Sequence, residues 1–199
     1  MGALRHCVIG ISGASGAPYA KRLLEVLSSE GVRDNVRLSI VLSDTAEQVW
    51  AQECEGHPRD FDLPIYGGRD YGAPFASGSS APDAMVIIPA SMSTVARVAQ
   101  GISDNLLTRA ADVVLKERRQ LLVVPREMPY SEIHLQNLLS LARLGAEVLP
   151  ASPSFYGRPR TIVELLDTVV GRVCDHLGIT HRLVRRWGEH EITSGLGDG

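Results

Sequence analysis

Residues 6–31 read HCVIGISGASGAPYAKRLLEVLSSEG and carry the strongest structural signal in the chain. Residues 6–12 are a short apolar run, and their length and flanks favour a buried β-strand over a helix. A glycine-rich turn follows, and Pro18 then stands in the first turn of a helix that Gly31 ends. A strand, a turn and a helix in this order are the repeating unit of proteins built on a parallel sheet.

The same unit recurs along the rest of the chain. Further strands are predicted at four apolar runs, residues 36–42, 84–90, 121–125 and 147–150. Helices are predicted after them, and each begins at capping residues, namely 43–45, Ser91, Ser103, Ser131 and Thr161. Residues 56–83 are rich in glycine, proline and aspartate, so we expect a long irregular loop of the functional or mobile kind there.

This alternation predicts a doubly wound α/β fold, in which right-handed crossovers place helices on both faces of a parallel sheet. A length of 199 residues fits one domain, expected at residues 1–190 and followed by a polar tail at 191–199. Hydrophobic residues make up 44% of the chain, which is enough for one large core. The predicted fold class is therefore a single-domain, Rossmann-like three-layer sandwich.

Charge and cysteine content argue against several classes of function. A formal net charge of -3 argues against a broad surface for nucleic acid or for an anionic membrane. The apolar runs, about six to eight residues long, are far shorter than the roughly 20 residues of a membrane-spanning helix. The cysteines are odd in number and far apart, and no secretory segment precedes them, so we expect a cytoplasmic protein without structural zinc.

Ligands of open parallel sheets bind at the carboxyl ends of the strands, so the residues that follow each predicted strand matter most. Residues 10–16, 43–44 and 89–94 are rich in small hydroxyl side chains, and residues 125–127 read Pro-Arg-Glu. Small side chains let backbone N–H groups approach a phosphate, and a helix amino terminus favours an anion. The sequence predicts a nucleotide-phosphate site at this edge of the sheet.

Two other interpretations of these turns remain open. The glycine turn reads G-x-x-G-x-x-G, whereas the turn that binds a dinucleotide reads G-x-G-x-x-G. Ser43 ends the second strand where an NAD site places an acidic residue, and Asp44 comes one residue late. Glycine and serine also serve turns and helix caps that bind no ligand.

Four long blocks of the sequence resemble one known family. They are GISGASGAPYAKRLLEVL, PASMSTVARVAQGISDNLLTRAADVVLKERRQLLVVPRE, IHLQNLLSLARLGAEVLP and SFYGRPRTIVELLDTVVGRVCDHLGI. Together they look like the UbiX-like flavin prenyltransferases, part of the FMN-binding flavoprotein superfamily. The similarity covers nearly the whole chain, which makes it far more specific than any single motif.

The resemblance implies a fold, a reaction and partners. The implied fold is flavodoxin-like, and the implied reaction adds a dimethylallyl group from dimethylallyl phosphate to N5 and C6 of reduced FMN without a metal. The prenylated FMN would then serve a separate UbiD-like decarboxylase. The family also forms large homo-oligomers, commonly dodecamers, with sites between subunits.

The resemblance also assigns roles to individual residues. It assigns FMN binding to Gly13, Ala14, Ser15, Ser43, Ser91, Met92, Ser93, Thr94 and Arg109. It assigns the phosphate of the prenyl donor to Lys116, Arg126, Tyr156 and Arg172. It assigns catalysis to Ser15, Glu53, Lys116, Glu127 and Trp187.

These residue types suit the implied chemistry. Breaking the donor's carbon–oxygen bond builds negative charge on the phosphate, which arginine and lysine can neutralise in place of magnesium. The face of Trp187 could stabilise the allylic cation by roughly 0.5 to 2 kcal/mol. A proton must also leave the flavin, and Glu53 or Glu127 with a raised pKa, relayed through the Ser15 hydroxyl, could accept it.

Each assigned residue also has a plain structural interpretation. Lys116 and Glu127 could form a surface ion pair, and Arg126 could cap a strand end. Arg172 lies on an amphipathic helix where exposed basic residues are common, and Trp187 could anchor an oligomer interface. Two further positions depart from the family pattern, because Asp44 and Ser93 stand where relatives often carry a basic residue.

Two alternative functions stay open beside the prenyltransferase. FMN-dependent cysteine decarboxylases share the fold, but their PASANT turn has asparagine where this chain has Ser93, and their P-x-M-N motif is replaced here. A non-catalytic FMN carrier or decarboxylase partner subunit would need the FMN turns alone. The donor and catalytic residues are also present in this chain, and they favour catalysis; they are Lys116, Arg126, Glu127 and Tyr156.

Overall fold

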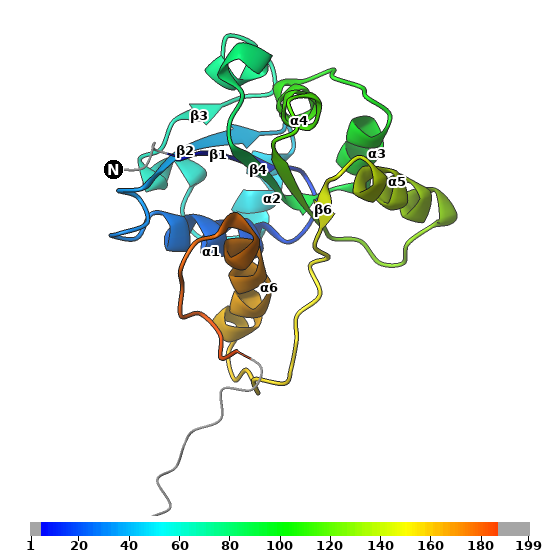
Figure 1. Cartoon of the computed structure of the whole chain (residues 1–199). Helices are drawn as coiled ribbons and strands as arrows, with labels where there is room; N and C mark the ends of the chain where they lie inside the picture. Colours follow the sequence, from blue (N-terminus) through cyan, green and yellow to red (C-terminus); the bar gives the residue numbers. More distant parts are fainter. Residues whose placement is uncertain (1–4, 187–199) are drawn as a thin grey trace, which may run out of the picture.

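The computed structural model describes residues 5–186, and these form one parallel sheet between two layers of helices (Figure 1). The order of the strands across the sheet is β3-β2-β1-β4-β5-β6. Their bounds are β1 Arg5–Ile11, β2 Val36–Leu42, β3 Ile65–Tyr66, β4 Ala84–Ala90, β5 Gln120–Pro125 and β6 Glu147–Val148. With the two-residue β3 left aside, the remaining strands have the order of a flavodoxin-like sheet, as the resemblance implies.

The helices cover both faces of the sheet, so the predicted doubly wound three-layer fold is confirmed. Their bounds are α1 Ala17–Leu27, α2 Ala46–Glu53, α3 Met92–Ala99, α4 Leu106–Lys116, α5 Glu132–Arg143 and α6 Ile162–Leu177. Buried side chains of α1, α2 and α6 share one core cluster, and those of α3, α4 and α5 share the other. Helix α1 follows β1 on one face of the sheet, and α3 follows β4 on the other face. Successive strands are therefore added in one direction up to β3 and in the opposite direction from β4 on.

The strands form because both of their faces are buried. Every residue of β4 is buried, and in β1 the side chains alternate between the two core clusters. Ile9 and Ile11 pack with α1 and α6, whereas Val8 between them packs with the α4 layer. Burial on both faces explains why the strands appear in the sequence as continuous apolar runs rather than as alternating patterns.

The stretch 56–83 is irregular for most of its length, as the sequence predicts, but it contains an edge strand that the sequence did not indicate. Residues Ile65 and Tyr66 pair with Ile40 and Val41 of β2, and the Pro64 carbonyl accepts a hydrogen bond from the Ile40 N–H at 2.8 Å. Three short 3₁₀ turns make up much of the rest of the stretch. A strand of two residues leaves no periodic pattern, and only its partner defines it.

The start of α4 corrects another prediction. The capping residue is Asn105, whose side chain accepts a hydrogen bond from the Thr108 N–H at 3.0 Å, and it is not Ser103. The Leu106 N–H donates to the carbonyl of Gly68 at 2.7 Å, which holds the first turn of α4 against the segment after β3. Serine and asparagine are both good caps, so this tertiary contact selects between them.

Two remaining predictions concern the ends of the chain and its relation to membranes. The predicted domain boundary at residue 190 and the tail after it lie outside the described residues. Within residues 5–186, no helix combines the length and the apolar character that crossing a membrane requires.

Candidate active site

Ser12 joins the two turns at the carboxyl ends of β1 and β4. Its hydroxyl donates to the Pro89 carbonyl at 2.7 Å and accepts a hydrogen bond from the Ser91 N–H at 2.8 Å. The side chain is 1% exposed, so it is a structural link rather than a ligand contact. Ser12 is not among the residues predicted for the site. Its signal in the sequence is its place as the first polar residue after a buried strand.

Two glycines shape the turn after β1. A Cβ at Gly13 would collide with the side chain of Thr45, so the turn after β1 and the turn after β2 pack directly against each other. Gly16 has φ 118°, in the left-handed region that glycine adopts most easily, and it caps α1. The turn thus presents Ala14 and Ser15 between two glycines, one required by the close approach of Thr45 and the other by its left-handed backbone.

Glu53, at the end of α2, occupies the amino terminus of α1. Its Oε2 accepts hydrogen bonds from the N–H groups of Gly16 at 2.7 Å and Ala17 at 2.9 Å, and its carboxylate also bonds to the Ser15 side chain. This arrangement corrects the expectation that every helix start at this edge is open to an anion. The first N–H groups of α1 are already used by the chain's own carboxylate.

The contacts of Glu53 also correct its expected protonation. Burial raises the pKa of the Glu53 carboxyl, but hydrogen bonds from Ser15, Gly16 and Ala17 and the charge of Arg126 outweigh burial. The net pKa is lowered from its usual 4.5, whereas the sequence-based expectation is a raised value. Glu53 is therefore ionised at neutral pH and can hold the proton of the Ser15 hydroxyl in a fixed direction.

Arg126 crosses from the end of β5 to the turn after β1. Its Nε donates to the carbonyl of Ser15 at 2.6 Å, so the guanidinium lies beside the Ser15 and Glu53 pair. Arg126 and Glu127 line a cavity of about 420 Å³, together with Tyr130 and Ser152. The structure thus brings together four of the predicted residues, namely Ser15, Glu53, Arg126 and Glu127.

Tyr156 and Arg172 share a neighbouring cavity of about 350 Å³. Ser152 lines this cavity and also the cavity of Arg126, so the two spaces adjoin. Arg172 projects from α6, where its Nη1 donates to Asp175 at 2.9 Å. Two of the predicted donor-phosphate residues therefore lie together, next to a third.

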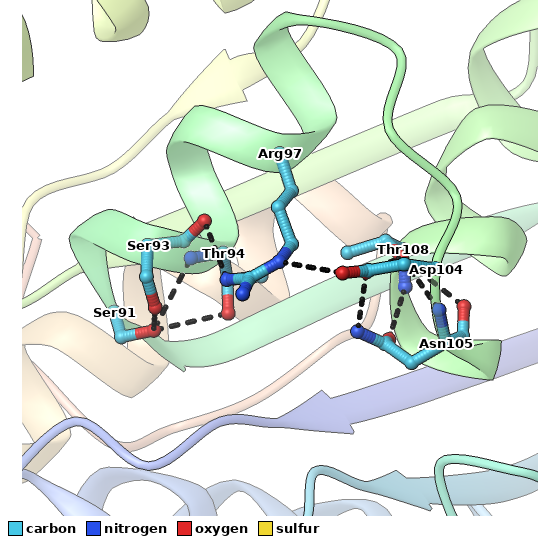
Figure 2. A network of polar contacts seen from close by, with 7 residues as sticks. All are labelled: Ser91, Ser93, Thr94, Arg97, Asp104, Asn105 and Thr108. Atoms are coloured by element: carbon cyan, nitrogen blue, oxygen red, sulfur yellow. Dashed lines mark hydrogen bonds and ion pairs between the residues drawn. The ribbon is translucent and has the colours of Figure 1, made fainter.

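The turn that opens α3 is lined with hydroxyl groups (Figure 2). The Ser91 Oγ accepts a hydrogen bond from the Thr94 N–H at 3.3 Å and lies 3.1 Å from Ser93 Oγ and 3.0 Å from Thr94 Oγ1. Met92 is 6% exposed and packs into the core, so its side chain does not face this turn.

Ser43 supplies a test of whether these residues suit a bound flavin nucleotide. Its Oγ is fully buried and has no hydrogen-bond partner within residues 5–186, although a buried hydroxyl ordinarily has one. A polar ligand group would satisfy it. Together with the hydroxyl-rich start of α3, this unpaired group fits FMN.

A family model described as Flavoprotein matches residues 2–174 of the chain. Flavin prenyltransferase UbiX of Methanocaldococcus jannaschii is 42% identical over 184 residues, which cover 91% of this chain and 97% of that protein. The chain belongs to the UbiX-like flavin prenyltransferase family. This membership agrees with the resemblance seen in the sequence blocks.

Two solved structures of UbiX-like proteins have the same fold. One is AnUbiX (PadA1) in complex with FMN and dimethylallyl pyrophosphate, with a TM-score of 0.88 and 38% identity over 94% of this chain and 99% of that one. The other is a dodecameric FMN-dependent UbiX-like decarboxylase from Escherichia coli, with a TM-score of 0.86 and 41% identity over 92% of this chain and 98% of that one.

Two predicted residues of this UbiX-like chain have contacts other than those expected. Lys116 ends α4 immediately before β5 begins, whereas Arg126 follows the opposite, carboxyl end of β5. The ammonium of Lys116 pairs with Glu117 at 2.7 Å rather than with Glu127. Arg109 donates from Nε to the Ala76 carbonyl at 3.0 Å and pairs with Asp112. A single chain therefore does not place Lys116 beside Arg126, and the contacts of Arg109 direct it toward the segment before β4.

Trp187, the last of the predicted catalytic residues, lies outside the described residues. The described chain ends at residue 186, in the segment that follows α6. Val184 and residues 185–186 of this segment line the cavity that holds Tyr156 and Arg172. The chain therefore approaches the predicted donor site just before Trp187.

Proposed function

We propose that this chain is a metal-independent flavin prenyltransferase. It transfers the dimethylallyl group of dimethylallyl phosphate to N5 and C6 of reduced FMN, and the product serves a UbiD-like decarboxylase. The observation that carries the proposal is the contact of Ser15, Glu53 and Arg126 at one sheet edge, in a chain 42% identical to a UbiX protein.

The turns at the carboxyl ends of three strands hold FMN. Gly13, Ala14 and Ser15 approach it through their backbone, Ser43 gains a partner for its buried hydroxyl, and the turn 91–94 faces the phosphate. When bound, reduced FMN supplies the nucleophilic positions N5 and C6. The residues around it hold the ring in place and exclude water.

Two arginines and a tyrosine hold the phosphate of the donor. Arg126, Tyr156 and Arg172 line two adjoining cavities, and their N–H and O–H groups can surround a phosphate monoester. As the carbon–oxygen bond breaks, the electron pair stays with the phosphate, and the guanidinium groups neutralise the growing charge. This electrostatic role replaces the divalent ion that a diphosphate leaving group needs.

Two carboxylates handle the proton released on ring closure. Glu53 is ionised at neutral pH and accepts the hydrogen bond of the Ser15 hydroxyl, so it fixes the direction of that hydroxyl's proton. Glu127 is exposed to the cavity of Arg126, where its Oε1 accepts a hydrogen bond from the Met128 N–H at 3.0 Å. We assign proton acceptance to this pair, with Ser15 as the relay.

Lys116 acts across a subunit boundary in this proposal. Because Lys116 precedes β5 and Arg126 follows it, Lys116 can reach a donor beside Arg126 only in the site of another copy. A dodecameric relative of 41% identity supports assembly of this chain into a homo-oligomer, which we propose is also a dodecamer. Cys54 and Cys174 form no disulfide within residues 5–186, which supports a cytoplasmic location, because reducing compartments keep thiols reduced.

Mass spectrometry of the flavin tests the proposed reaction. After anaerobic incubation with reduced FMN and dimethylallyl phosphate, the flavin extracted from the protein should be heavier by one five-carbon unit. Arg126→Gln should lower the rate of product formation about 100-fold or more, because one leaving-group donor is lost. Arg33→Gln, an exposed arginine of the opposite sheet edge, is the matched control. An unchanged flavin mass, with FMN shown to be bound, would identify a carrier instead.

A further inference from the structure

Arg97 turns back toward the start of its own helix. It lies one turn after Ser93 on α3, and its Nη1 donates to the Ser93 carbonyl at 3.3 Å. Its Nε donates to Asp104 Oδ2 at 3.0 Å, at the end of the loop between α3 and α4. Figure 2 shows the guanidinium between the hydroxyl turn 91–94 and the first turn of α4.

Asp104 is itself held by the cap of α4. Its Oδ1 accepts hydrogen bonds from Asn105 Nδ2 at 3.0 Å and from Thr108 Oγ1 at 3.4 Å, which leaves Oδ2 for Arg97 (Figure 2). The carboxylate is thus oriented by two groups of α4. It positions the guanidinium at the mouth of the turn, although the Arg97 side chain is 40% exposed.

The turn itself lacks a charge that matches a phosphate. Ser91, Ser93 and Thr94 offer neutral hydroxyl groups, and a helix amino terminus offers only a partial positive charge. A guanidinium has five N–H donors, and the contacts with Ser93 and Asp104 use two of them. The remaining donors of Arg97 can bind a phosphate seated on the turn, because guanidinium and phosphate geometries match.

We propose that Arg97 binds the phosphate of FMN, with Asp104 as its positioning residue. The pair makes the chain selective for FMN over riboflavin, which has the same ring system but lacks the phosphate. This inference rests on the proposed function, because it places FMN on the α3 turn. It concerns flavin recognition and requires no turnover.

Parallel titrations with oxidised FMN and riboflavin, followed by flavin fluorescence, test the inference. Arg97→Gln should raise the Kd for FMN about tenfold or more, since a charge-assisted contact is lost, and change the Kd for riboflavin less than about twofold. Arg97→Lys should give an intermediate loss, because the charge stays and the planar fork is lost. Arg33→Gln, which removes the same charge at the opposite edge, should leave both values unchanged.

The outcomes separate the inference from the proposed function. Equal weakening of FMN and riboflavin, or no change in either, would overturn the role of Arg97 while leaving FMN binding intact. If the unaltered protein binds neither flavin, the proposed function fails, and the inference fails with it. The riboflavin value of each variant also reports whether its site is still folded.

Discussion

Glu53 stabilises the folded chain only while its carboxylate is ionised. Burial raises the pKa of the carboxyl, but the hydrogen bonds from Ser15, Gly16 and Ala17 and the charge of Arg126 bring it below 4.5. The folded state therefore binds this proton more weakly than the unfolded chain does. The contribution of Glu53 to stability is fully present above the unfolded pKa and is lost as the pH falls through the folded pKa.

Replacing Glu53 by glutamine should therefore have an effect that depends on pH. At pH 7, we expect Glu53→Gln to lower the free energy of unfolding by about 1 kcal/mol, the scale of a carboxylate at a helix amino terminus. The difference in free energy of unfolding between the variant and the unaltered protein should shrink as the pH falls from about 5 to about 3, because the Glu53 carboxyl loses its charge in this range. Urea unfolding at each pH measures both values. Glu55→Gln, an exposed neighbour, is the control, and a gap independent of pH would contradict the assignment.

At the residue scale, position along the chain predicts some contacts and not others. Arg126 directly follows a buried strand, so its place at the carboxyl edge could be predicted from the sequence. The contact of Glu53 with the start of α1 could not, because 37 residues separate Glu53 from Gly16 and the direction of its side chain depends on how α2 packs. The pKa of Glu53 depends on this contact, so the direction of its pKa shift could not be predicted either.

The start of α4 provides a test at the scale of one element. Asn105 caps the helix through its bond to the Thr108 N–H, so Asn105→Ala should lower the free energy of unfolding by about 1 kcal/mol. Ser103→Ala should change it by less than about 0.5 kcal/mol, since Ser103 is not the cap. Urea unfolding of both variants checks the difference, and equal losses would mean that Ser103 contributes to the cap as well.

The elements themselves follow from the sequence to different degrees. The strands β2 and β4 match the predicted residues 36–42 and 84–90 because unbroken burial on both faces leaves unbroken apolar runs. The edge strand β3 is defined only by its pairing with Ile40 and Val41, and a two-residue strand has no pattern of its own. Local signals thus identify the buried elements, and tertiary contacts select the caps and the edge.

At the scale of the whole molecule, α4 separates the predicted site into two groups. The helix begins beside Gly68 at the carboxyl edge and ends just before β5 at the amino edge. Lys116 stands just before the predicted strand 121–125, so linear order already places it at the amino edge, and only the resemblance groups it with Arg126. The structure also leaves large apolar side chains exposed, which an assembly can cover, and they include Met128, Ile133, Leu135, Leu139, Phe155 and Ile162.

If the site is shared between subunits, mixing two inactive variants should restore activity, which a site within one chain does not allow. If Lys116 of one copy acts with Arg126 of another, Lys116→Ala and Arg126→Ala oligomers should each be inactive in the mass assay. Oligomers assembled from both variants mixed before assembly should then recover about a quarter of the original activity, because random mixing unites two unaltered contributors in one site of four. Variants mixed after separate assembly are the control and should stay inactive as long as subunits do not exchange. If co-assembled oligomers recover nothing while each variant still binds FMN, the two residues serve the same chain's site. If the Lys116→Ala oligomer is itself active, Lys116 plays no part in transfer.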